Sequence, residues 1–170
     1  GINSLSGITA NAQIRKAISL ACDRTVFAQS AYNGYATAET SPFNPQASIA
    51  QNVKIFSSEA DSITAKQALN QSMIDSKKLK VNILVNKNNN RIACATLLKN
   101  QLEAIGFTVT IDEEGTKEYT RRVKNTEFNL YIGEVKLSDD MCLYPFFDDK
   151  SGGVRYGIDN ENLTCDDLYS

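Results

Sequence analysis

The chain has 170 residues, of which 42% are hydrophobic and 22% charged, proportions typical of one globular domain. Its formal net charge of −2 gives no electrostatic reason to expect nucleic acid or an anionic membrane as a partner. Histidine is absent and the four cysteines lack C-x-x-C spacing, which argues against a zinc site and excludes triads that need histidine. No apolar run reaches the ~18 residues of a transmembrane helix.

Two helical segments are predicted near the amino terminus. The first carries apolar residues at the i, i+3, i+4, i+7 spacing of a core-facing helix: Ile14, Ala17, Ile18 and Ala21. The stretch DRTVFAQSAY adds one or two helical turns, which end at Asn33-Gly34. The segment 35–53 is loop-like, and loops of that length usually carry function or wrap a neighbouring domain.

A third helix is predicted over Ser62–Met73, with Asp61 or Ser62 as its N-cap. Five of its apolar residues are expected to face inward: Ile63, Ala65, Ala68, Leu69 and Met73.

The segment 79–133 alternates strands with helices. Leu79–Val85 has the period-2 pattern of a strand, and Asn90–Ile105 has helical spacing that Gly106 ends. Phe107–Ile111 alternates again, a short helix follows around Tyr119 and Val123, and Phe128–Gly133 is a third strand. Strands joined through single helices are expected to be parallel neighbours, so the sequence predicts an α/β fold. Ligands of such sheets gather beyond the carboxyl ends of the strands, where Gly133 leads into GEVKLSDD.

The remaining polar and cysteine residues have plain structural interpretations. The basic clusters Lys77-Lys78-Lys80 and Arg121-Arg122-Lys124 are expected to be solvated faces. Cys22 and Cys94 are expected to be small buried apolar residues on helices. Cys142 and Cys165 could pair, which the sequence leaves open.

Two long segments resemble the extracellular solute-binding proteins of the oligopeptide and nickel ABC transport family, solute-binding family 5. Residues 14–45, IRKAISLACDRTVFAQSAYNGYATAETSPFNP, resemble the family pattern R-x-A-(I/L), then D-R, then G-x-A before a proline-containing loop. Residues 79–140 are similar to the family's strand, helix, I-G-(I/F)-x-V, E-Y and F-(D/N)-L course. Between them, ADSITAKQAL stands where the family has a short helix.

The resemblance implies one α/β lobe of a type II periplasmic-binding-protein clamshell, with a mostly parallel sheet flanked by helices. Residues 1–170 would be the second, carboxyl-terminal lobe, a fragment of a larger two-lobed protein. Residues 1–10 would then be the segment that crosses from the missing first lobe.

The function implied by the resemblance is non-catalytic. The protein would be the substrate-binding component of an ABC importer, would bind peptides by clamshell closure without a cofactor, and would deliver them to a membrane permease. It would be monomeric, extracellular or periplasmic, and anchored as a lipoprotein. Nickel chelates, oligosaccharides or a signalling peptide are alternative ligands within the family. A free-standing protein-interaction or sensor domain is the alternative from another class.

Four residues are the candidate ligand-binding set: Glu134, Asp139, Asp140 and Arg155. In the resembled family an acidic residue near Asp139 and Asp140 pairs with the amino terminus of a bound peptide, and solvated loop acids are the alternative. Glu134 is expected to share a face with Lys136, either in the cleft or as an exposed ion pair. Arg155, beside Gly152-Gly153, could meet a ligand carboxylate, although glycine pairs usually mark plain turns.

Two other features are interpreted as structural. Asp23-Arg24, a marker of the resembled family, is expected to act as a helix cap with a local ion pair. Tyr144, Phe146 and Phe147 are expected to be core packing rather than the wall of a pocket.

Overall fold

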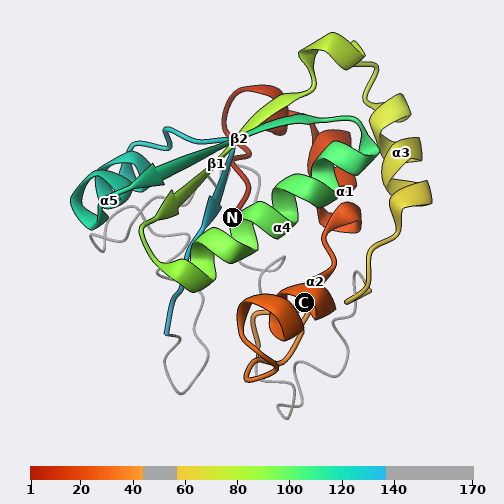
Figure 1. The fold of residues 1–170 in the computed structure, drawn as a ribbon. Coiled ribbons are helices and arrows are strands. Elements are labelled where there is room, and N and C mark those ends of the chain that lie inside the picture. Colours follow the sequence, from red (N-terminus) through yellow and green to blue (C-terminus); the bar gives the residue numbers. More distant parts are fainter. Residues whose placement is uncertain (44–56, 137–170) are drawn as a thin grey trace.

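A three-stranded parallel sheet organises the fold (Figure 1). The computed structural model describes residues 1–43 and 57–136. Strand β1 (Lys80–Asn86) lies between β2 (Thr108–Glu114) and β3 (Leu130–Ile132), in the order β2-β1-β3. Its register runs from Lys80↔Thr108 to Asn86↔Glu114 on one side and from Ile83↔Leu130 to Val85↔Ile132 on the other. The predicted parallel arrangement is therefore confirmed.

Helices cover both faces of β1. Val81, Ile83 and Val85 alternate toward the main core, which also contains buried residues of α1 (Ala12–Ala21), α3 (Ser62–Gln71) and α4 (Asn89–Ile105). Leu84 points the other way and packs with residues that include Val123 of α5 (Thr116–Lys124). Figure 1 shows α1, α3 and α4 on one side of the sheet and α5 on the other. A strand buried on both faces reads as a continuous apolar run, as Ile83-Leu84-Val85 does.

Helix α4 is capped at both ends, and Gly106 ends it as the sequence predicts. The Asn88 side chain accepts a hydrogen bond from the Arg91 backbone N–H, which satisfies one donor of the first turn. Gly106 follows the last turn with φ 115°, in the left-handed region, and its N–H returns to the helix carbonyls.

The amino-terminal helices also follow their prediction, with one correction. Ile14, Ala17, Ile18 and Ala21 are all buried. Asp23 caps α2 (Arg24–Val26) by accepting from the Val26 N–H at 3.0 Å. The local ion pair expected of Arg24 was wrong, because its guanidinium donates to three backbone carbonyls, those of Ser19, Cys22 and Ser57. These bonds hold the α1–α2 corner to the segment that precedes α3.

A π-helix, η2 (Phe27–Ala31), continues directly from α2. Asn33 and Gly34 follow with positive φ, which agrees with the predicted end of the helix. π-Helices are rare, and many of those that occur lie at functional sites. Tyr32 directly follows this one.

Helix α3 differs from its prediction on two apolar residues. Ala65, Ala68 and Leu69 are buried as expected, and Asp61 is the N-cap. Ile63 and Met73, both expected to face inward, are 73% and 91% exposed. Ile63 lies on the helix side opposite Ala65, and Met73 lies beyond the last helical residue with φ 58°, so that it leaves the helical face.

Strands β2 and β3 also differ in length from their predictions. β2 continues past Ile111 to Glu114, because pairing with β1 extends through polar residues that the period-2 pattern does not mark. β3 is limited to Leu130–Ile132, since it pairs with β1 only from Ile83 to Val85. Two short 3-10 turns, η1 (Ile8–Ala10) and η4 (Ser76–Lys78), precede α1 and β1.

The amino-terminal residues lie against β3. Ile2 forms an antiparallel bridge with Leu130, and the Asn3 N–H donates to the Asn129 carbonyl at 2.9 Å. The Asn3 side chain is buried, and its amide nitrogen donates to the Phe128 carbonyl at 3.0 Å. A buried amide that finds backbone partners fixes the position of this segment, because breaking those bonds would leave buried polar groups unsatisfied.

We expect Gly106→Ala to lower the free energy of unfolding by about 1–2 kcal/mol, since an L side chain is strained at this left-handed position. No neighbouring atom lies within 4 Å of the added Cβ, so the loss would come from the backbone conformation and not from a clash. Gly106→Asn should lose less, because Asn tolerates the left-handed region. Urea unfolding curves measure both variants, and an Ala variant as stable as the parent would contradict the assigned conformation.

Candidate ligand-binding edge of the sheet

The carboxyl ends of the three strands lie at one edge of the sheet. All pairings are parallel, so Asn86, Glu114 and Ile132 end their strands in the same direction. Two segments leave this edge close to each other, one into α4 and one toward Glu134. Open α/β sheets bind ligands at such an edge.

Glu134 emerges from β3 and pairs with the first turn of α4. Its Oε2 accepts from Arg91 Nη2 at 2.6 Å, while Arg91 Nη1 donates to Asn86 Oδ1 at 2.8 Å. Arg91 is thereby held between the end of β1 and the segment after β3. Of the two alternatives for Glu134 and Lys136, an ion pair between them is not formed, because helix α4 brings a guanidinium to the same edge and Glu134 pairs with that.

The Arg91–Glu134 pair is polar and accessible. The Glu134 side chain is 73% exposed and the Arg91 side chain 19%. Ion pairs between solvent-exposed side chains contribute about 0–1 kcal/mol to stability. In this pair water can solvate the exposed carboxylate, and Arg91 keeps Asn86 Oδ1 as a second acceptor. The carboxylate can therefore exchange Arg91 for another partner at small cost to the fold.

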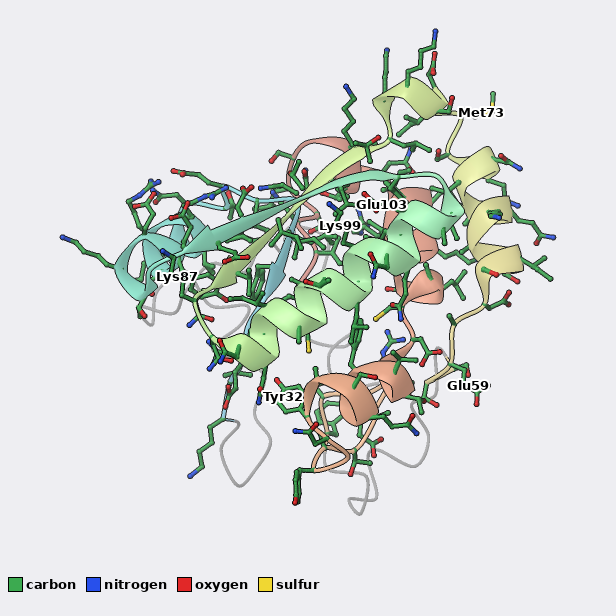
Figure 2. All side chains as sticks on the ribbon, viewed as in Figure 1. Tyr32, Glu59, Met73, Lys87, Lys99 and Glu103 are labelled. Carbon is green, nitrogen blue, oxygen red and sulfur yellow. The ribbon has the colours of Figure 1, made fainter. Side chains whose placement is uncertain are left out.

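Tyr32 and Cys94 lie in the same neighbourhood. Burial raises the pKa of the Tyr32 phenol, with the Cys94 thiol and the Glu134 carboxylate adding to the effect and Arg91 opposing it. Burial likewise raises the pKa of Cys94, which is a free, buried thiol. Both groups are therefore neutral at neutral pH, beside the ion pair of Arg91 and Glu134. In Figure 2, Tyr32 is labelled on the segment below the first turn of α4.

Sequence reasoning found Glu134 but missed Arg91 and Tyr32. Arg91 carries no signal beyond a position in the first helical turn, and its role depends on a contact with a residue 43 positions away. The π-helix before Tyr32 is itself a tertiary feature. Asp139, Asp140 and Arg155 lie outside the described residues, as do the aromatic cluster 144–147 and the Gly152-Gly153 pair.

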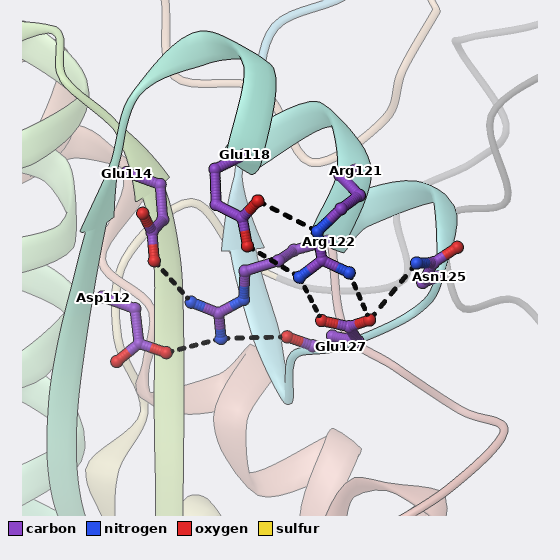
Figure 3. A network of polar contacts seen from close by, with 7 residues as sticks. All are labelled: Asp112, Glu114, Glu118, Arg121, Arg122, Asn125 and Glu127. Carbon is purple, nitrogen blue, oxygen red and sulfur yellow. Dashed lines mark hydrogen bonds and ion pairs between the residues drawn. The ribbon is translucent and has the colours of Figure 1, made fainter.

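A second charged network joins α5 to the sheet (Figure 3). Arg122 donates to Asp112 Oδ2 at 2.7 Å, to Glu114 Oε1 at 3.1 Å and to the Glu127 carbonyl at 3.1 Å. Its side chain is only 16% exposed, so the solvated face expected for this cluster was wrong at Arg122. Although burial opposes it, pairing with Asp112 and Glu114 raises the pKa of Arg122. These contacts bind α5 to β2 and have a structural role.

Neighbouring Arg121 makes the outer part of the network. It forms bidentate contacts of 2.6–2.9 Å with both carboxylate oxygens of Glu118 and of Glu127. Hydrogen bonds from Arg121 lower the pKa of Glu118, and those from Arg121 and Asn125 lower the pKa of Glu127.

Residues 1–43 and 57–136 contain no group of three or more His, Cys, Asp or Glu residues arranged to hold a metal ion. Within the same residues, no helix has the length and apolar composition needed to span a bilayer.

Comparison with known proteins gives a family match over most of the chain. The family described as bacterial extracellular solute-binding proteins, family 5 Middle, matches residues 1–153. A search of curated proteins gives no match.

Solved structures share the fold. NikZ from Campylobacter jejuni in complex with Ni(L-His) superposes with a TM-score of 0.76 at 15% identity, over 92% of this chain and 34% of NikZ. The oligopeptide-binding protein AppA from Bacillus subtilis in complex with a nonapeptide gives a TM-score of 0.68 at 19% identity, over 78% of this chain and 29% of AppA. The Escherichia coli murein tripeptide binding protein MppA gives a TM-score of 0.60 at 22% identity, over 76% of this chain and 27% of MppA. The chain thus spans about a third or less of each of these proteins.

Acidification should weaken the fold through Glu118 and Glu127. Their folded-state pKa values are lowered, so their stabilising effect is present above the unfolded pKa of about 4.3 and is lost as pH falls through the folded values. Arg121→Met removes the guanidinium that lowers both pKa values, so the variant should lose less stability than the parent between about pH 5 and pH 3. Urea midpoints across this range measure the difference.

Lys117→Met is the matched control, because Lys117 is exposed on the same helix and forms none of these contacts. Parallel pH profiles for the Arg121 variant and the parent would contradict the assignment.

Proposed function

Because this chain belongs to the bacterial extracellular solute-binding proteins of family 5, we propose that it forms part of the substrate-binding component of an ABC importer. The family match over residues 1–153 is the observation that carries this proposal. Members of this family are solute-binding proteins, and the proposed role is non-catalytic. The polar edge around Arg91 and Glu134 supports it, since it lies where α/β sheets bind ligands.

The chain is proposed to be the second lobe of a two-lobed clamshell. In support, 92% of the chain superposes on only 34% of NikZ, as one lobe of a larger protein would. Residues 1–10 are proposed to cross from the first lobe, and the bridge between Ile2 and Leu130 would hold that segment against β3. The parent protein is proposed to be monomeric, extracellular or periplasmic, and anchored as a lipoprotein.

Peptides are the proposed ligands. AppA binds a nonapeptide and MppA is a murein tripeptide binding protein, while NikZ, in complex with Ni(L-His), supports a nickel chelate as the alternative. An oligosaccharide or a signalling peptide remains a further alternative within the family. In the proposed mechanism, ligand bound between the lobes stabilises a closed state that the membrane permease recognises.

The proposed ligand-binding residues all follow β3 in the chain: Glu134, Asp139, Asp140 and Arg155. A carboxylate that faces a ligand ammonium in a closed, water-poor cleft makes a charge-assisted hydrogen bond, which is stronger than a neutral one. Glu134 could provide such a group by exchanging Arg91 for the ligand, since the pair contributes little to stability.

Native mass spectrometry of the full two-lobed protein, purified without denaturant, tests the proposal. A set of added masses that fragment as peptides is the expected result. A single sharp added mass would indicate a chelate, a sugar or one signalling peptide. If no mass is added, even after incubation with a peptide mixture, the transport proposal fails and a protein-interaction domain becomes the better hypothesis.

Asp139→Asn or Asp140→Asn should weaken the binding of peptides with a free amino terminus by about 1.5–3 kcal/mol, the usual contribution of a charged hydrogen bond. Amino-acetylated versions of the same peptides should lose far less, because they lack the ammonium group. Isothermal titration calorimetry on the two-lobed protein measures both. Equal losses for the two peptide types would remove the amino-terminal role from these residues.

A further inference from the structure

The chain leaves β3 beside two tyrosine side chains. The Tyr119 hydroxyl, from α5, donates to the carbonyl of Ile132, the last residue of β3, at 2.8 Å. A Cβ added to Gly133 would lie 2.8 Å from Tyr119 Oη and 2.8 Å from Tyr131 Cε2. Real Cβ atoms essentially never lie so close to other atoms, so any larger residue at position 133 would have to displace one of the rings.

The ring of Tyr119 is held in place by the sheet and by its own helix. It packs against the smaller hydrophobic cluster, whose buried members are Leu84, Val123 and Phe128. Helix α5, which carries Tyr119, is joined to β2 by the contacts of Arg122 with Asp112 and Glu114. The hydroxyl therefore reaches Ile132 from a ring that has little freedom to move.

The hydrogen bond to Ile132 fixes more than one atom. The peptide unit between Ile132 and Gly133 is planar, so holding its carbonyl oxygen orients the whole unit. Only the φ and ψ angles of Gly133 separate that unit from Glu134, and glycine limits these angles less than any other residue. The two tyrosine rings close to the Cα of Gly133 therefore supply a restriction that glycine itself lacks.

The direction set at Gly133 decides where the Glu134 carboxylate lies. Glu134 Oε2 accepts from Arg91 Nη2 at 2.6 Å. Arg91 is fixed from its own side, because its backbone N–H donates to Asn88 Oδ1 and its Nη1 donates to Asn86 Oδ1 at 2.8 Å. The pair thus combines a cation held by α4 and β1 with an anion whose position depends on how the chain leaves β3.

We propose that Tyr119 and Gly133 are positioning residues of the ligand edge, which together place the Glu134 carboxylate against Arg91. The Tyr119 hydroxyl orients the last peptide unit of β3, and the lack of a side chain at position 133 lets the chain pass beside the two rings. A contact of Glu134 with ligand rests on the proposed function, whereas its placement by Tyr119 does not. Since α5 and α4 lie on opposite sides of the sheet (Figure 1), a helix on the far face would set the geometry of this edge.

The alternative is a purely local role for Tyr119. In that case its hydroxyl only closes the end of β3 and stabilises the packing of α5. The two roles differ in their effect on Arg91, which belongs to α4 on the other face of the sheet. A local role predicts a loss of folding stability without any change at Arg91, whereas positioning predicts that the Arg91 guanidinium gains freedom when the hydroxyl is removed.

NMR measurement of guanidinium rotation in the ligand-free chain of 170 residues tests the proposal. Rotation of Arg91 about its Nε–Cζ bond exchanges Nη1 and Nη2, so it has to break the bonds to Asn86 and Glu134. Tyr119→Phe removes only the hydroxyl and should speed this rotation by about two- to fivefold, the change expected when an ion pair of this kind is lost. Gly133→Ala should speed it by a different route, because the added Cβ displaces a ring.

Three comparisons separate positioning from a general loosening of the fold. The Arg122 guanidinium, on the same helix as Tyr119, should keep its rotation rate in both variants. Tyr35→Phe is the matched control, since it removes a hydroxyl from a side chain that is 94% exposed and should leave Arg91 unchanged. In a Glu134→Gln chain Arg91 should already rotate faster, and the addition of Tyr119→Phe should have no further effect.

Three results would overturn the proposal. One is an unchanged rotation rate of Arg91 in Tyr119→Phe and Gly133→Ala chains whose circular dichroism shows that they are folded. Another is an equal acceleration of Arg122, which would give Tyr119 a purely local role. The third is an acceleration by Tyr119→Phe that persists in full in the Glu134→Gln chain, because Tyr119 would then act on Arg91 by another route. Since no ligand is present, these results are independent of the mass-spectrometric test, and the positioning and transport proposals can each fail alone.

Discussion

The central strand β1 is the element on which the other described elements depend, because it is hydrogen-bonded on both edges and buried on both faces. Its parallel pairing requires crossover connections between the strands. Because these connections run toward opposite edges of the sheet and are right-handed, α4 lies on one face and α5 on the other. The same pairing directs the ends of all three strands to one edge. A slip of one residue would exchange Ile83 and Leu84 between the faces, so the register also fixes which side chains reach that edge.

The two charged networks at the sheet have different physical roles. Arg122 is mostly buried and has two carboxylates and a carbonyl as acceptors, so removing both carboxylates would leave a largely desolvated charge without its ion-pair partners. The Arg91–Glu134 pair includes a largely exposed carboxylate that water can solvate, and its contribution to stability is small. The first network therefore suits a role in holding α5, and the second suits a site where a ligand replaces an internal partner.

The proposed ligand site lies at the carboxyl end of β1. The carboxyl edge carries a guanidinium, a carboxylate and the phenol that follows the π-helix, groups that can recognise a polar solute.

The sequence by itself determined the order and type of the elements from α1 to β3, because their signals are local. The helical spacing of Ile14 to Ala21, the glycine at 106 and the alternation of Val81, Ile83 and Val85 each act within a few residues. Tertiary structure decided the exposure of Ile63 and Met73, the length of β2 and the partner of Glu134. Each of these depends on a contact or a chain direction set far away in the sequence: the close packing of α3 on α1, the β1 ladder that extends β2, and the position of Arg91 at the start of α4.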